Sequence, residues 1–258
     1  MDSVLYKRHH EMAYVTINRP KRRNALTQEA WQKLAYIFTE ISNDESLRCV
    51  VITGAGTQSF AAGNDISEFE KLRKNAEDVR AYNDITLKAI HAIENSIHPT
   101  IARIDGYCLG GGLEIALACD IRIASPPSTF GIPVKNMGIY LDPALVETMV
   151  NSIGRTTALE LVLEGRMLTA QEALERRILT RIAPVDSLDA EVNKSVEQIC
   201  SGAPLANRFN RNAIRQAAIK APSTDADFSK AASYGDTEDY HNAWTSFLNK
   251  KKPTFKGN

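Results

Sequence analysis

Ile101-Ala-Arg-Ile-Asp-Gly-Tyr-Cys-Leu-Gly-Gly-Gly-Leu-Glu-Ile-Ala-Leu-Ala-Cys-Asp120 is the stretch that decides the fold. It begins with a short apolar run after Pro99, which predicts a buried strand. It ends with small apolar residues, which predict a helix with Glu114 in its first turn. Between the two lie Gly106 and the glycine triplet 110–112, which indicate a tight turn or the close approach of a ligand. Ahead of a helix, such glycines leave backbone N–H groups facing that ligand, with the positive end of the helix dipole behind them.

Three interpretations of this glycine-rich segment are open. The first is an ordinary strand-to-helix turn. The second is a nucleophile elbow around Cys108, because residues 106–110 match the pattern G-x-C-x-G. An elbow needs a downstream histidine, and only His241 follows, so a buried structural cysteine is the better interpretation of Cys108. The third is an oxyanion hole in which Gly111 donates its N–H and Glu114 transfers protons.

The composition excludes several classes of protein. Lysine plus arginine and aspartate plus glutamate both number 31, so the net charge is zero and no partner such as nucleic acid or an anionic membrane is expected. The four cysteines lie far apart without metal-ligand spacing, so we predict no metal site and no disulfide framework. The N-terminal residues do not resemble a signal peptide, and no apolar run is long enough to span a bilayer, so a cytoplasmic location is expected.

Hydrophobic patterns along the chain predict an α/β fold. Residues 4–17 alternate between apolar and polar in two runs, which predicts a hairpin, and Thr27 is expected to cap the helix that follows. Strands that alternate with helices predict a sheet whose strands are mainly parallel. The strands are expected at residues 49–54, 100–104, 121–124 and 179–183. The helices are expected at residues 28–42, a region up to 95 broken near 75, 143–151, 155–164 and 186–201, with a loop at 130–143.

A second glycine-containing turn follows a predicted strand, in Phe60-Ala61-Ala62-Gly63-Asn64-Asp65-Ile66. Two turns of this kind can each direct one backbone N–H to the same point. An oxyanion hole requires two such donors. The two turns together therefore favour the third interpretation.

Several further motifs occur in a fixed order along the chain. They are Asn18-Arg19-Pro20, Asn24-Ala25-Leu26, Asp120-Ile-Arg-Ile-Ala, Phe130-Gly, Gly154-Arg-Thr-Thr-Ala-Leu-Glu-Leu, Leu168-Thr-Ala-Gln-Glu-Ala and Phe247-Leu-Asn-Lys-Lys-Lys-Pro. With the two glycine turns, this order resembles the enoyl-CoA hydratase/isomerase (crotonase) superfamily over nearly the whole chain. The resemblance implies an α/β spiral of ββα units over residues 1–200. It also implies an appended helical segment, residues 201–258, that covers CoA or mediates assembly into a homotrimer or a dimer of trimers. Breaks in that segment are expected at Pro222 and Gly235.

The resemblance also implies the substrate and the residues that bind it. The substrate is an acyl-CoA thioester, and no cofactor is expected because coenzyme A is part of the substrate. Asn64 and Gly111 supply the two backbone donors of the oxyanion hole, and Val134 and Tyr140 line the acyl pocket. A solvated basic surface is the alternative for the lysines and arginines among the predicted CoA contacts. These contacts are Lys21, Arg22, Arg23, Ala62, Asp65, Ile66 and Lys251.

The reaction depends on which carboxylates are present. Glu114 matches the first catalytic glutamate of the hydratases, but Val134 follows Pro133 where the second glutamate is expected. Asp142 matches a catalytic aspartate of dienoyl-CoA isomerases and of a hydrolytic dehalogenase, and it is equally typical of a helix N-cap before Pro143. We therefore predict an enoyl-CoA isomerase or hydratase-like lyase that uses Glu114 and Asp142. The alternatives are a hydrolase or dehalogenase-like enzyme using Asp142, and a non-catalytic protein that binds acyl-CoA.

Overall fold

Two sheets form the centre of the molecule. The computed structural model describes residues 2–218 and 224–258. The larger sheet has the strand order β1-β2-β3-β5-β7-β10, and the smaller has the order β4-β6-β8-β9. The strands are β1 (Val4–His9), β2 (Met12–Ile17), β3 (Cys49–Gly54), β4 (Ser59–Ala61), β5 (Thr100–Ile104), β6 (Tyr107–Leu109), β7 (Ile121–Ala124), β8 (Thr129–Gly131), β9 (Leu168–Thr169) and β10 (Arg181–Ile182).

The strands follow a repeated ββα order. β3 and β4, β5 and β6, and β7 and β8 each place one strand in the larger sheet and the next in the smaller, before the chain turns into helix. Pairing is parallel from β2 to β10 in the larger sheet and from β4 to β8 in the smaller. Antiparallel pairing joins the predicted hairpin β1–β2 and the pair β8–β9. The predicted α/β fold of ββα units is confirmed.

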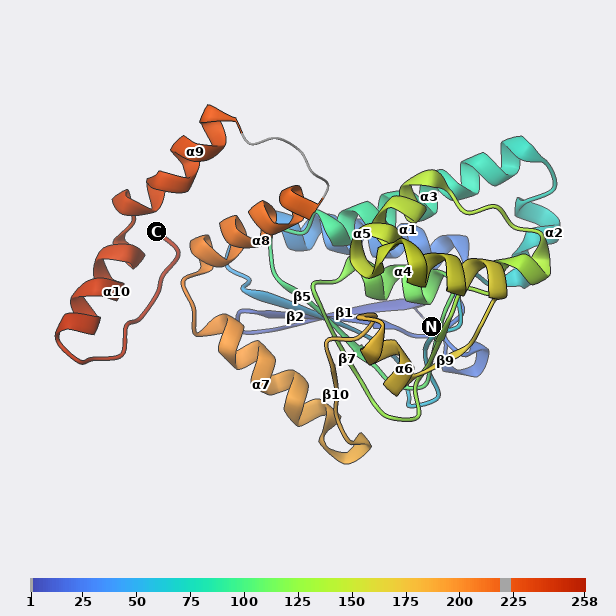
Figure 1. Cartoon of the computed structure of the whole chain (residues 1–258), viewed down its shortest axis with the longest axis horizontal. Coiled ribbons are helices and arrows are strands. Elements are labelled where there is room, and N and C mark those ends of the chain that lie inside the picture. Colours follow the sequence, from blue (N-terminus) through green and yellow to red (C-terminus); the bar gives the residue numbers. More distant parts are fainter. Residues whose placement is uncertain (1, 219–223) are drawn as a thin grey trace.

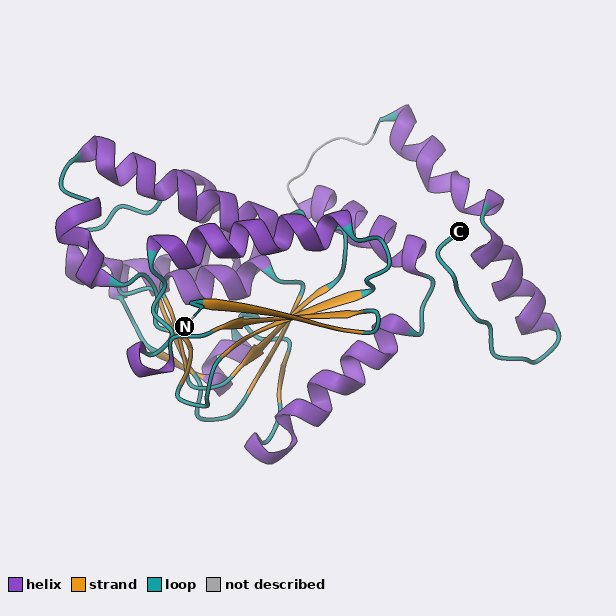
Figure 2. Cartoon of the chain, turned by 180° about the vertical axis from the view of Figure 1, so that it is seen from behind, coloured by secondary structure: helices purple, strands orange, loops and turns teal. Residues whose placement is uncertain are grey.

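Helices cover both faces of the larger sheet (Figure 2). Along β3, Val50 and Ile52 pack into the main core, while Cys49 and Val51 belong to a second cluster with Val192 of α7 (Leu188–Cys200). A strand buried on both faces has no apolar–polar alternation, which explains its continuous apolar run. The helices are α1 (Gln28–Asn43), α2 (Phe69–Leu72), α3 (Ala76–Glu94), α4 (Gly111–Ala118), α5 (Pro143–Leu159), α6 (Ala170–Glu175), α7 (Leu188–Cys200), α8 (Pro204–Ala218), α9 (Asp225–Ala232) and α10 (Glu238–Leu248).

Local signals place several helix ends as expected. The Thr27 hydroxyl accepts a hydrogen bond from the Ala30 N–H (3.2 Å) and caps α1, and Asn75 caps α3. The break expected between the helices at 143–151 and 155–164 is present as a kink inside α5, where Gly154 has a non-helical conformation (φ +77°). A π-helical turn follows at Glu160–Glu164. The segment expected to be a loop contains β8 and a short 3-10 helix, η3 (Val134–Met137).

The C-terminal helices attach to the body through α8. Arg211 and Arg215 of α8 both form ion pairs with Asp120, which follows α4, at 2.6 and 3.0 Å. Burial opposes ionisation of Asp120, but the two guanidinium groups outweigh it and lower its pKa. α9 and α10 project away from the sheets (Figure 1). The expected break at Pro222 lies outside the described residues, and the one near Gly235 is a 3-10 turn at Ser233–Asp236.

Candidate functional site

The two glycine turns lie against each other. A Cβ atom on Gly63 would lie 3.2 Å from the Leu109 carbonyl oxygen and 3.5 Å from the Gly111 nitrogen. Gly63 (φ +96°) and Gly110 (φ +49°) also adopt left-handed backbone conformations, which side chains disfavour. Both positions therefore require glycine, and the contact brings two backbone segments from different ββα units to one point.

Within the described part of the chain, two backbone N–H groups at this point have no hydrogen-bond acceptor. Leu26 pairs with Asn64 through bonds from the Leu26 N–H to the Gly63 oxygen and from the Asp65 N–H to the Leu26 oxygen, both 2.8 Å. In such a pairing, the N–H of Asn64 faces away from Leu26. Gly111 is the first residue of α4, so its N–H has no acceptor within the helix. This arrangement suits an oxyanion, and the role predicted for Asn64 and Gly111 stays a prediction.

Trp31 holds the side chain of Asn64. The buried Trp31 indole Nε1–H of α1 donates a hydrogen bond to the Asn64 Oδ1 (2.7 Å), and the same ring would lie 2.7 Å from a Cβ on Gly111. In the sequence, Trp31 is only one of the apolar residues on the buried face of α1. That pattern predicts a core residue and does not predict its contact with the site.

Glu114 lies in the first turn of α4, three residues after Gly111. Burial raises the pKa of Glu114 to about 7, the Arg73 guanidinium acts in the opposite direction, and Asp142 raises it further. No hydrogen bond or ion pair to its carboxylate occurs within the part of the chain that the structure describes. Glu114 is therefore an unpartnered carboxyl group that exchanges a proton near neutral pH.

Asp142 is the N-cap of α5. Its Oδ1 accepts a hydrogen bond from the Ala144 N–H (3.0 Å), and Pro143 is the first helical residue. The N-cap interpretation is therefore confirmed. Asp142 also lies near enough to Glu114 to raise its pKa, so the structure brings the two predicted carboxylates into one region.

The predicted acyl-pocket residues lie in different surroundings. Val134 begins η3 and packs against the main core. The Tyr140 side chain is 92% exposed, so within this chain it is not packed against other site residues. The structure therefore leaves Val134 partly buried against the core and Tyr140 exposed.

Most predicted CoA contacts are brought together. The Ala62 N–H donates to the Arg23 carbonyl oxygen (3.1 Å), which places the exposed basic loop of Lys21, Arg22 and Arg23 beside the second glycine turn. Asp65 is buried and forms an ion pair with Arg19 (2.8 Å).

Ile66 and Lys251 are the remaining predicted CoA contacts. Ile66 is 57% exposed and directly follows Asp65. Lys251 follows α10, which projects away from the sheets, so the single chain does not bring Lys251 to the site (Figure 1).

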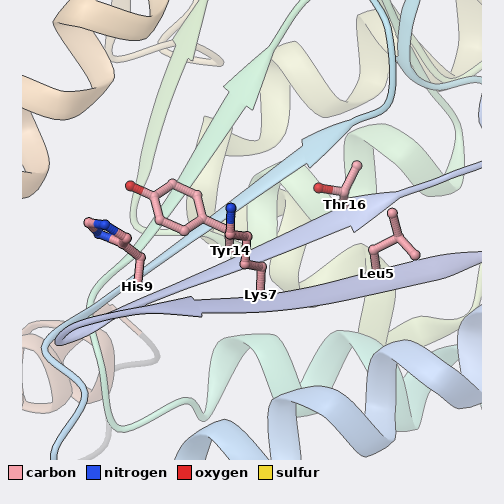
Figure 3. Close-up of a pocket in the computed structure, with 5 residues that line it drawn as sticks. All are labelled: Leu5, Lys7, His9, Tyr14 and Thr16. Atoms are coloured by element: carbon pink, nitrogen blue, oxygen red, sulfur yellow. The ribbon is translucent and has the colours of Figure 1, made fainter.

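A groove on the outer strands of the larger sheet lies elsewhere. It is formed by β1 and β2 and contains none of the predicted site residues (Figure 3). Its lining consists of Leu5, Lys7, His9, Tyr14 and Thr16. Among residues 2–218 and 224–258, no three histidine, cysteine or carboxylate side chains cluster as a metal site would require. None of the helices described is long and apolar enough to cross a membrane.

Comparisons with known proteins find chains of similar sequence and fold. A family model described as "Enoyl-CoA hydratase/isomerase" matches residues 7–258. A "Short-chain-enoyl-CoA hydratase" from Clostridium acetobutylicum is 33% identical, over 98% of this chain and 97% of the relative. A "Crotonyl-CoA hydratase" from Syntrophomonas wolfei is 30% identical, over 98% of each chain. The crystal structure of "an enoyl-CoA hydratase/ carnithine racemase" from Magnetospirillum magneticum superposes with a TM-score of 0.97 at 38% identity, covering 100% of this chain and 97% of that one.

The raised pKa of Glu114 predicts how stability depends on pH. Below about pH 4.5 the carboxyl is protonated in the folded and unfolded states alike. Between there and about pH 7 only the unfolded state releases the proton, so the wild type loses stability as the pH rises, and the loss is complete above pH 7. Glu114→Gln cannot ionise, so its free energy of unfolding relative to the wild type should rise by about 2–3 kcal/mol between pH 4.5 and 8. Urea unfolding at both pH values measures this.

Glu197→Gln is the matched control, because Glu197 is exposed on α7. It should follow the wild type at both pH values. Parallel pH profiles for wild type and Glu114→Gln would contradict the raised pKa.

Proposed function

Because the chain belongs to the enoyl-CoA hydratase/isomerase family, we propose that it transfers a proton on the acyl chain of an enoyl-CoA thioester, with Glu114 as the proton carrier. One observation carries this proposal. An unpartnered carboxyl group with a pKa of about 7 lies one helical turn from the N–H of Gly111, where the two glycine turns meet. A group that titrates near the working pH both takes up and returns protons efficiently.

The proposed mechanism places the thioester oxygen on the N–H groups of Asn64 and Gly111. Removing a proton from the carbon beside the thioester moves negative charge onto that oxygen. Two preorganised donors stabilise this enolate, and each is worth about 3–4 kcal/mol. Glu114 takes the proton from one carbon, and protonation at another carbon completes the reaction.

Isomerisation of the double bond is the reaction that this set of residues supports best. It needs one carboxylate that shuttles a proton and no second group that activates water. Val134 has no group that accepts a proton, so it cannot activate a water molecule for addition to the double bond. Hydration is the second candidate, because the relatives at 30–33% identity are named hydratases and Asp142 lies near enough to Glu114 to interact with a shared water.

The basic loop of Lys21, Arg22 and Arg23 is proposed to contact the CoA phosphates. Its support is the hydrogen bond from the Ala62 N–H to the Arg23 oxygen, which holds the loop beside the second glycine turn. With the CoA phosphates bound at this loop, the thioester end of the molecule would lie between the two glycine turns.

Isotope exchange tests the proton carrier. In heavy water, the wild type should exchange hydrogen for deuterium at the α- and γ-carbons of short enoyl-CoA thioesters. Glu114→Gln should reduce the exchange rate by at least about 100-fold, because the amide cannot accept the proton. Mass spectrometry of the thioester measures the exchange, and the product mass distinguishes isomerisation from hydration.

Asp142→Asn is the comparison variant, because an asparagine still caps α5. Continued exchange in Glu114→Gln together with loss in Asp142→Asn would contradict the assignment of Glu114. Absence of exchange in the wild type with every thioester would reject proton transfer altogether.

Asn64→Ala tests whether the donor at that position is the backbone. The substitution keeps the N–H and removes only the side chain held by Trp31, so kcat should change by less than about threefold. The free energy of unfolding should fall by about 1 kcal/mol from the lost hydrogen bond to the Trp31 indole. Steady-state kinetics and urea unfolding measure the two effects. A loss of kcat by about 100-fold with the fold retained would show that the Asn64 side chain itself is needed.

We also propose that the C-terminal helices assemble a homotrimer or a dimer of trimers. The support is that α10 leaves Trp244 46%, Phe247 81% and Leu248 70% exposed on a helix that projects from the body. Phe247→Glu should lower the molar mass measured by light scattering toward that of one chain, because a charge would be buried in the contact. Thr245→Glu, at an exposed position of the same helix, is the control. A monomeric wild type would contradict the assembly.

A further inference from the structure

Arg73 lies at the corner between α2 and α3. It is the C-cap of α2, where its N–H donates to the Phe69 carbonyl oxygen (3.0 Å), and Asn75 begins the next helix two residues later. The corner fixes the backbone of Arg73. Its side chain is half-buried.

Two aromatic rings hold the guanidinium of Arg73. Its central carbon lies 4.7 Å from the centre of the Phe69 ring and 5.3 Å from that of Tyr82, and these rings meet edge to face. Tyr82 is 1% exposed, so this support is rigid. A planar cation stacked on rings is stabilised through its face, while its N–H donors at the edge remain available.

Those donors have no hydrogen-bond or ion-pair partner among residues 2–218 and 224–258. Every other half-buried arginine of the described chain donates a guanidinium hydrogen bond, and the arginines without one, apart from Arg73, are exposed. Arg73 is therefore the exception. Removing a guanidinium from water without replacing its hydrogen bonds is unfavourable, so the site favours an anion that supplies them.

The position of Arg73 identifies which part of a ligand it faces. Burial lowers the pKa of Arg73, while the charges of Tyr82 and Glu114 act to raise it. Arg73 in turn acts to lower the pKa of Glu114. The two groups interact but form no ion pair within the described residues. Glu114 is the residue assigned to the acyl carbons, whereas the basic loop assigned to the CoA phosphates lies beside Ala62. Arg73 stacks on Tyr82 of α3, and α3 packs against α4, which carries Glu114, so Arg73 lies on the acyl side of the proposed site.

We propose that Arg73 binds a carboxylate at the far end of the acyl chain, so that the preferred substrate is the mono-CoA thioester of an unsaturated dicarboxylic acid. The guanidinium fork matches a carboxylate in a bidentate pair, and the Phe69 and Tyr82 rings fix its plane in advance. The inference rests on the proposed function, because that function places the thioester at Asn64 and Gly111.

Binding of saturated thioesters tests the proposal without requiring turnover. Glutaryl-, adipyl- and pimelyl-CoA are compared by calorimetry with valeryl-, hexanoyl- and heptanoyl-CoA, which match them in carbon number and lack the terminal carboxylate. The full-length wild type should bind at least one dicarboxylic member roughly 10- to 100-fold more tightly than its neutral partner. Arg73→Gln should abolish this preference while changing the affinity for the neutral thioesters by less than about threefold. Arg73→Lys, which keeps the charge without the planar fork, should retain only part of it.

Arg80→Gln is the control, because Arg80 is exposed on α3 and should leave all affinities unchanged. Equal binding of the two series by the wild type at every chain length would overturn the proposal. An equal loss for both series in Arg73→Gln would also overturn it, and would assign Arg73 a role in positioning Glu114. A preserved carboxylate preference together with no isotope exchange would reject the proposed function and leave the binding site standing.

Discussion

The contact between Gly63 and Gly110 is the constraint on which the rest of the molecule depends. A Cβ on either residue would come within 3.7 Å of the other residue's Cα. The approach arises because β3 pairs with β5 and β4 pairs with β6, both in parallel, so that successive ββα units present their turns at the same edge. Gly112 extends the constraint, since a Cβ there would lie 2.2 Å from the Ala61 carbonyl oxygen. Ordering these glycines on folding costs more conformational entropy than ordering other residues. Because they lack side chains, the two donors of different units can lie side by side.

Long, uniformly apolar strands could be predicted well, and three-residue strands could not. The strands predicted at 49–54, 100–104 and 121–124 agree with β3, β5 and β7 to the residue, because punctuating residues bound each apolar run. β4 and β6 are too short to show any periodicity and resemble parts of turns. Their existence followed only from the family resemblance, and pairing across units, which a local pattern does not contain, stabilises them.

The same limit applies to the candidate site. Gly111 and Glu114 are neighbours in sequence, so one motif revealed them together. Trp31 and Arg73 reach the site from α1 and from the corner after α2, and their local patterns resemble an apolar helix face and a charged surface. What distinguishes them is a contact in space: a hydrogen bond to Asn64 for Trp31 and an aromatic support for Arg73. Asp142 lies between these cases, since its N-cap role followed from the neighbouring proline and its catalytic role stays a prediction.

The ion pairs of Asp120 connect the site to a distant surface. α4 carries Glu114 in its first turn and ends at Ala118, two residues before Asp120, and its eight residues span about 12 Å at 1.5 Å per residue. Arg215 also donates a hydrogen bond to the Ala118 carbonyl oxygen (2.6 Å). α8 therefore contacts both the backbone at the end of α4 and the side chain of Asp120. α4 is thus a short helix with Glu114, the proposed proton carrier, at one end and the C-terminal segment attached at the other. Glu114 and the C-terminal segment are therefore attached to the same eight-residue helix, one at its start and the other at its end.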